Sequence, residues 1–181
     1  TRSPGPQVVR GPGVILRFPA PRPPDAEGLD LMAKQQMPAY FRSQRQVIID
    51  TEALIRRYYD AFNAGDPEGM LACLTEDVEH RVNEGGHRIG KAKFAEFCGH
   101  MGVSYREQLK DLTIFATDDG TRGAAEFVVH GEYLKTDPGL PEAKGQTYIL
   151  PAGGFFEVRD GLISRITTFY NLNDWVRQVS Q

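Results

Sequence analysis

Residues 58–67, with the sequence YYDAFNAGDP, predict the end of one helix and the start of another. Upstream of this stretch, apolar side chains from Val47 to Phe62 recur at three- and four-residue spacing, as on the buried face of an amphipathic helix. Asp66 can cap a second helix whose first position is Pro67, because proline has no N–H to leave unpaired there. The folded part of the chain is therefore expected to begin with two consecutive helices.

Downstream of this junction, short strands and one more helix follow the turn residues. The expected order after the second helix is a strand (77–82), a Gly-containing turn (84–86), a helix (91–101), four long strands (105–115, 122–134, 146–158 and 162–170) and a final helix (174–179). Helices followed by consecutive long strands are typical of an α+β fold rather than a doubly wound parallel one.

Composition narrows the functional classes. The chain has 181 residues, of which 40% are hydrophobic and 25% charged, as in globular proteins. A net charge of -3 gives no general attraction to nucleic acid or anionic lipid, and no apolar run reaches the roughly 20 residues that cross a membrane. Cys73 and Cys98 have neither disulfide-framework nor zinc-site spacing. Reduced thiols and a cytoplasmic location are expected, with no nucleic-acid or membrane partner.

Residues 1–46 differ from the rest of the chain. They hold eight of the twelve prolines and seven Lys or Arg against three Asp or Glu. A proline-rich segment without hydrophobic periodicity does not bury enough surface to offset its ordering entropy, so a disordered tail is expected, with the folded domain at 47–181. Two alternatives stay open: a targeting segment, and a natural chain that starts at Met32.

Three motifs then resemble one known superfamily. YYDAFNAGD (58–66), LTEDV (74–78) and GLISRI (161–166) are similar, in this order, to the nuclear transport factor 2-like superfamily, and most similar to its SnoaL-like, steroid delta-isomerase-related subgroup. The resemblance covers about residues 47–180. It implies a cone made by a strongly curved antiparallel sheet wrapped around three helices, with an internal apolar pocket, and a homodimer formed through the outer face of the sheet.

The resemblance also implies several functions. Members include isomerases, dehydratases, polyketide cyclases, epoxide hydrolases and non-enzymatic binders. Ketosteroid isomerases use a carboxylate base, a tyrosine and a protonated aspartic acid. The tyrosine falls on Tyr58, but the base position falls on Val82 or Asn83 and the aspartic acid position on Gly153 or Gly154. One of the three positions matches, so the base must come from elsewhere.

Strand alternation supplies other candidates. If Val82 faces the pocket, Val78 and His80 share that face. His80 is a candidate general base, or alternatively a core histidine that donates to a backbone carbonyl. Glu84, at the exit of the strand, is a second candidate base, or alternatively a turn residue in solvent.

The same alternation of side chains predicts which residues of the later strands line the pocket. Tyrosine hydroxyls suit a carbonyl or enolate oxygen and apolar walls suit a small apolar ligand, although buried tyrosines also find backbone partners. Pro151 and the Gly153-Gly154 pair are compatible with a bulge, which would reverse the side of the sheet that each following side chain faces. The two adjacent glycines also indicate a close approach by a ligand or by another backbone. The expected substrate-binding residues are Asn83, Phe127, Val129, Tyr148, Phe156, Tyr170 and Asn171.

Polar residues at alternate positions predict the opposite face of the sheet. Glu126, His130 and Glu132 alternate with apolar residues and are assigned to a homodimer face. The charged pairs 106–107 and 87–88 are expected at the surface. No metal site and no cofactor are expected, because the sequence has no metal-ligand spacing, dinucleotide fingerprint or phosphate-binding loop.

Together these features predict a cofactor-independent isomerase or cyclase that moves a proton on a small apolar carbonyl compound. His80, or Glu84 in its place, would move the proton, while Tyr58 with Tyr148 or Tyr170 would hold the oxyanion. The alternative is a non-catalytic small-molecule binder or a dimeric scaffold on the same fold.

Overall fold

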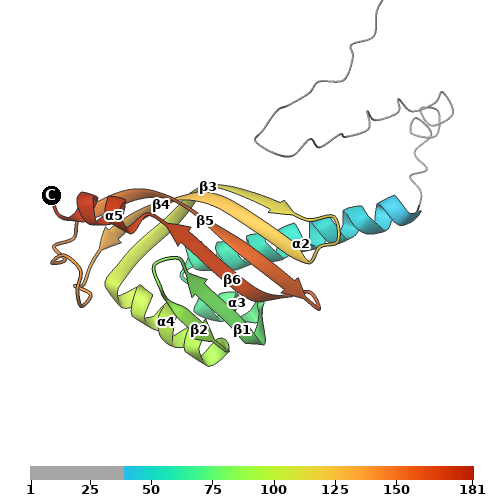
Figure 1. Ribbon diagram of the computed structural model, residues 1–181, viewed down its shortest axis with the longest axis horizontal. Coiled ribbons are helices and arrows are strands. Elements are labelled where there is room, and N and C mark those ends of the chain that lie inside the picture. The colour runs from blue at the N-terminus through green and yellow to red at the C-terminus, as the bar shows by residue number, and fades with distance from the viewer. Residues whose placement is uncertain (1–38) are drawn as a thin grey trace, which may run out of the picture. The chain divides into compact units, whose positions relative to one another are not determined.

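A computed structural model describes residues 39–181 (Figure 1). The elements are α2 (Ala39–Ala64), α3 (Pro67–Ala72), β1 (Leu74–Val82), β2 (His87–Ile89), α4 (Lys91–Ser104), β3 (Tyr105–Ala116), β4 (Arg122–Tyr133), β5 (Thr147–Arg159), β6 (Leu162–Tyr170) and α5 (Leu172–Val179). The α+β class is confirmed. Within this part of the chain, no helix has both the length and the apolar character needed to span a membrane.

The first helix starts earlier than the sequence predicts. α2 begins at Ala39, so the expected boundary at residue 46 falls inside this helix. The remainder of the expected tail, with the targeting alternative and Met32, lies outside the described residues. The junction that follows α2 is confirmed. The Asp66 side chain accepts a hydrogen bond from the Gly69 N–H at 2.9 Å, and Pro67 opens α3.

The sheet contains six strands in the order β2-β1-β6-β5-β4-β3. Neighbouring strands are antiparallel except β1 and β6, which are parallel. The expectation of a wholly antiparallel sheet is therefore wrong at one pair. The reason is the connection: the chain leaves β1 through the β2 hairpin and α4, forms the antiparallel series β3 to β6, and returns beside β1 in the same direction.

The sheet is curved and unclosed, and helices cover one of its faces (Figure 1). Helix α4 contacts β1 and β2 near one end of the strand order and β3 at the other end. α4 therefore lies across the helix-covered face, from one end of the strand order to the other. This arrangement creates the interior in which the candidate site lies.

Alternating burial identifies the inner face of the sheet. In β4, Ala125, Phe127 and Val129 are buried, while Glu126 is exposed, as predicted. The predicted parity of β5 is also confirmed, because β5 pairs with β4 from Thr147 to Glu157 without a register shift.

The adjacent glycines of β5 make room for close contacts rather than for a bulge against β4. A Cβ on Gly154 would lie 2.7 Å from the Tyr59 hydroxyl oxygen, and a Cβ on Gly153 would lie 2.9 Å from the Ala125 carbonyl oxygen. The predicted close approach of another backbone is confirmed at Gly153, whereas at Gly154 a tyrosine side chain makes the approach.

Candidate functional site

A cavity of about 1050 Å³ lies between the inner face of the sheet and the helices. This is at the upper end of the range for small-molecule sites. Its walls are mainly aromatic and aliphatic, and include Phe62, Phe97, Phe127, Leu150, Ile166 and Trp175. The predicted apolar interior is thus present, and the few polar groups that face it determine what chemistry it can support.

One of these polar groups is a carboxyl on β3. The Tyr148 hydroxyl donates a hydrogen bond to Glu107 Oε1 at 2.6 Å, and both residues line the cavity. Burial raises the pKa of Glu107, an effect that the hydrogen bond from Tyr148 opposes. Burial, with the Glu107 charge next, raises the pKa of Tyr148, so the phenol stays protonated and acts as the donor. Room for the Tyr148 ring comes from Gly131 on the neighbouring strand, since a Cβ there would overlap the ring.

The prediction that Glu107 lies at the surface is wrong. Tyr105, Glu107 and Leu109 share the inner face of β3, and the register with β4 shifts only beyond Lys110. The available signal was the alternation of these three residues along the strand. Its companion Arg106 is exposed, as predicted, and forms an ion pair with Glu132 at 2.8 Å.

His80 faces the interior, as predicted from the parity of β1. The residue is 4% exposed, and its ring packs against Phe94 and Phe97 with centroid distances of 5.2 Å and 4.8 Å. Nδ1 is buried and has no hydrogen-bond partner, which contradicts a bond from this nitrogen to a backbone carbonyl. Burial, and next the charge of Arg88, lowers the pKa of His80 to about 4. The imidazole is therefore neutral at physiological pH.

Arg88 was also expected at the surface, and it lies instead on the cavity wall. It pairs across the β1–β2 hairpin with His80, so the two side chains share one face. Its guanidinium lies over the Phe97 ring, 4.2 Å from the centroid. Nη1 is buried and has no hydrogen-bond partner among residues 39–181. The neighbouring His87 is exposed, as predicted, and bonds to Glu79 at 2.7 Å.

The predicted tyrosines all reach the cavity. Tyr58 is buried, lines the cavity and packs edge-on against Tyr59 at 5.2 Å. Burial, followed by the neighbouring Tyr59, raises its pKa well above the ordinary value, so its hydroxyl keeps its proton. Tyr170 lines the cavity near its rim, and burial, followed by the charges of Glu84 and Glu107, raises its pKa.

Other predicted residues have structural roles. The Asn83 side chain donates to the Tyr170 carbonyl at 2.8 Å and accepts from the Tyr170 N–H at 3.2 Å, joining the ends of β1 and β6. The Asn171 side chain caps α5 by accepting from the Asp174 N–H at 3.1 Å. Both side chains satisfy local backbone groups, which is the usual role of Asn at turns and helix starts.

Phe156 and Glu84 lie at opposite extremes of exposure. Phe156 is 1% exposed and packs in the core against Tyr58 and Tyr59. Glu84 is exposed at the cavity mouth, where its carboxylate accepts from Asn83 at 3.1 Å. The turn alternative for Glu84 therefore fits its position. Phe127 and Val129 lie on the cavity wall as predicted.

A second polar group lies where α4 meets the loop after β4. Asp137 accepts from the Tyr105 hydroxyl at 2.6 Å and forms an ion pair with His100 Nε2 at 2.8 Å. The backbone N–H of Asp137 donates to the Tyr133 hydroxyl at 2.8 Å. These contacts fix the loop against α4. Among residues 39–181, no three His, Cys, Asp or Glu side chains come close enough together to hold a metal ion.

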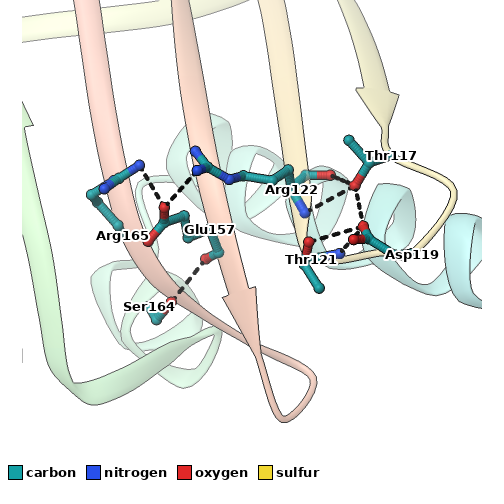
Figure 2. Close-up of polar contacts among 7 residues, drawn as sticks. All are labelled: Thr117, Asp119, Thr121, Arg122, Glu157, Ser164 and Arg165. Carbon is teal, nitrogen blue, oxygen red and sulfur yellow. Dashed lines mark hydrogen bonds and ion pairs between the residues drawn. The ribbon is translucent and has the colours of Figure 1, made fainter.

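The outer face of the sheet carries both charged and aromatic side chains. Figure 2 shows Glu157 between Arg122 and Arg165, at 3.2 Å and 2.6 Å, in a row across three strands. Beside this row, Phe155 is 57% exposed and packs edge-on against Phe169. The alternation of β4 places Glu126, His130 and Glu132 on this same face, as predicted.

The chain matches a known domain family and a solved structure of similar sequence. A family profile described as "SnoaL-like domain" matches residues 55–166. A candidate polyketide cyclase from Silicibacter sp. TM1040 is 62% identical, with a TM-score of 0.72 over 74% of this chain and 98% of that chain. The comparison with curated proteins finds no match.

More distant structures share the fold. A candidate ketosteroid isomerase from Kribbella flavida DSM 17836 is 26% identical, with a TM-score of 0.51 over 68% of this chain and 79% of that chain. An NTF2-like protein from Burkholderia xenovorans LB400 is 17% identical, with a TM-score of 0.60 over 73% of this chain and 97% of that chain.

Proposed function

Because the chain belongs to the SnoaL-like domain family, within the nuclear transport factor 2-like fold, we propose that it is a cofactor-independent isomerase or cyclase that moves a proton on a small apolar carbonyl compound. The observation that carries this proposal is the Glu107 carboxyl, which lies on the wall of a mainly apolar cavity and is held there by Tyr148. A carboxylate desolvated in this way is a stronger base than one in water.

Glu107 is the proposed base. Its free carboxylate oxygen takes a proton from the carbon next to the substrate carbonyl, and the bonding electrons move to the carbonyl oxygen as an enolate. Return of the proton to another carbon gives an isomer. Alternatively, the enolate carbon attacks a second carbonyl and closes a ring, and the alkoxide that forms takes the proton back from Glu107. Tyr58, which keeps its proton, is the proposed donor to the enolate oxygen.

His80 is the alternative base from the sequence analysis. A pKa of about 4 makes it a weaker base than an ordinary histidine. Its buried Nδ1 also has no carboxylate to orient the ring and stabilise an imidazolium. These observations favour Glu107 over His80 for proton removal.

Deuterium exchange tests the proposal without knowledge of the natural substrate. Apolar ketones such as 2-tetralone are incubated with the protein in D₂O, and NMR follows the loss of protons next to the carbonyl. Glu107→Gln should slow enzyme-dependent exchange by about 100-fold or more, while Glu126→Gln, on the outer face, should not. Full exchange in Glu107→Gln with loss in His80→Gln would make His80 the base. Binding of ketones without exchange would support the non-catalytic binder.

The pH profile provides a second readout. The base must be deprotonated, so exchange should rise with pH through the raised pKa of Glu107 and then level off. An inflection below the ordinary range of glutamic acid would contradict this assignment.

A homodimer through the outer face of the sheet is proposed as well. The exposed Phe155 and Phe169 pair and the neighbouring charged row support it, because exposed aromatic side chains with a polar rim are typical of interfaces. Sedimentation should give twice the chain mass, and Phe155→Glu should give the monomer. A monomer at all concentrations of the unmodified protein would refute the dimer.

A further inference from the structure

The hairpin of β1 and β2 brings two polar side chains, each with an unsatisfied nitrogen atom, to one wall of the cavity. His80 and Arg88 are direct cross-strand partners. In the part of the chain that the structure describes, Arg88 Nη1 and His80 Nδ1 are buried without hydrogen-bond partners. Buried polar groups normally have partners, and an unpaired buried donor costs free energy. Both residues also line the cavity, so a ligand that draws these side chains toward it can supply the missing partners.

No acidic side chain of the hairpin neutralises Arg88. Those of β1 are engaged elsewhere: Glu76 with Lys91, Asp77 with Arg159, and Glu79 with Arg81 and His87. Glu84, in the turn, is exposed and bonded to Asn83. The nearby Cys98 is not a counter-charge either, because burial raises the pKa of its thiol to about 11. The positive charge of Arg88 is therefore directed at the cavity without an internal partner.

The Phe97 ring holds this charge in place. With the guanidinium stacked on the ring at 4.2 Å, the plane of its N–H donors is fixed relative to the cavity wall. A planar, fixed guanidinium matches the two oxygens of a carboxylate. Beside it, the neutral His80 ring is fixed by Phe94 and Phe97, and the one nitrogen that carries a proton can donate to the same anion. One positive charge and one neutral donor suit a singly charged anion better than a doubly charged phosphate.

We propose that His80 and Arg88 form a carboxylate subsite, so that the molecule taken by the cavity is an apolar carbonyl compound carrying a carboxylate group. This rests on the proposed function of the cavity as a substrate site and adds the class of substrate. The carboxylate binds Arg88 and His80, and the apolar body lies along the aromatic walls. His80 thereby has a binding role, which agrees with the assignment of proton transfer to Glu107.

Matched probes test this inference by binding alone. The probes 4-phenylbutyrate and 4-phenylbutyramide have the same apolar body and differ in the charge of the head group. Their binding to the full chain is followed by calorimetry and by the fluorescence of Trp175, which is the one tryptophan of the chain and lines the cavity. The carboxylate should bind about tenfold more tightly than the amide, or better.

Variants assign that preference to the subsite. Arg88→Met keeps an apolar side chain against Phe97 and should remove the preference by weakening carboxylate binding while leaving the amide unchanged. Arg81→Met, on the outward side of β1, should keep the preference. Equal affinities of both probes for the unmodified protein, or a preference that survives in Arg88→Met, would overturn the carboxylate subsite and leave the cavity as a ligand site. If neither probe binds, both the carboxylate subsite and the role of the cavity as a ligand site are overturned. Tighter binding of a phosphonate with the same phenylalkyl body than of the carboxylate would also overturn the carboxylate subsite.

Discussion

Acid should weaken the fold through His80, and His80→Gln should remove this part of the effect. The pKa of the side chain falls from 6.5 to about 4 on folding, first because of burial and second because of the Arg88 charge. Between these values the unfolded chain binds a proton that the folded protein does not. The free energy of unfolding therefore decreases as pH falls below about 6.5, and this decrease is complete below about pH 4.

The size of the effect follows from the shift. Each pKa unit corresponds to about 1.4 kcal/mol, so the full loss is about 3 kcal/mol, of which about 2.5 kcal/mol is present at about pH 4.5. Urea unfolding followed by Trp175 fluorescence, at about pH 7 and about pH 4.5, measures it. Between these two conditions the unmodified protein should lose about 2 to 3 kcal/mol more than His80→Gln loses.

Two comparisons isolate the histidine. Carboxylates with lowered pKa, such as Glu79, also lose stability in acid, but they are present in both proteins and cancel in the difference. His130→Gln removes a histidine from the outer face of the sheet, away from this wall, and serves as the control. If His80→Gln and the unmodified protein lost equal stability in acid, the histidine would not be held neutral by burial, and the reasoning would fail.

Three further changes probe the packing and the termini of the elements. Gly131→Ala should lower the free energy of unfolding by about 1 to 3 kcal/mol, because the added Cβ overlaps the Tyr148 ring. Gly102→Ala is the control, because nothing lies within 4 Å of a Cβ there. Equal urea midpoints of these two variants would contradict the close contact at Gly131. Asp66→Ala should cost about 1 kcal/mol through loss of the α3 cap, and an unchanged thermal midpoint would show that the cap contributes nothing. Asn83→Ala should cost about 1 to 3 kcal/mol by leaving backbone groups unpaired; a change in probe affinity without a change in stability would return Asn83 to the binding site.

The features that were predictable from the sequence are those set by neighbouring residues. The start of α3 follows from Asp66 and Pro67, and the buried side of β4 follows from the alternation that a strand imposes on its side chains. The position of His80 follows from the same alternation in β1. In each case the pattern and the geometry span only a few residues.

The features that were missed depend on distant residues. Glu107 and Arg88 have charges that ordinarily favour solvent. Glu107 is held inside by Tyr148, 41 positions away, and Arg88 by the ring of Phe97 on the next helix. The parallel pairing of β1 with β6 likewise joins segments that no local pattern relates. Alternation along β3 could have indicated the inner side for Glu107, but the contacts that hold these charges inside exist only after the chain has folded.

The parallel pairing also sets the order in which the protein can be completed during synthesis. Strands β1 and β2 join the sheet only through β6, and Asn83 bonds to a residue 87 positions later. The wall that carries His80 and Arg88 emerges early from the ribosome, but beyond its own β1–β2 pairing it has no strand to join until β6 has been made. Closing so long a loop is slow, which places this wall among the last parts to form. We therefore expect a chain that ends before residue 162 to leave the hairpin with His80 and Arg88 unattached to the rest of the sheet, even though every residue of the subsite has been translated.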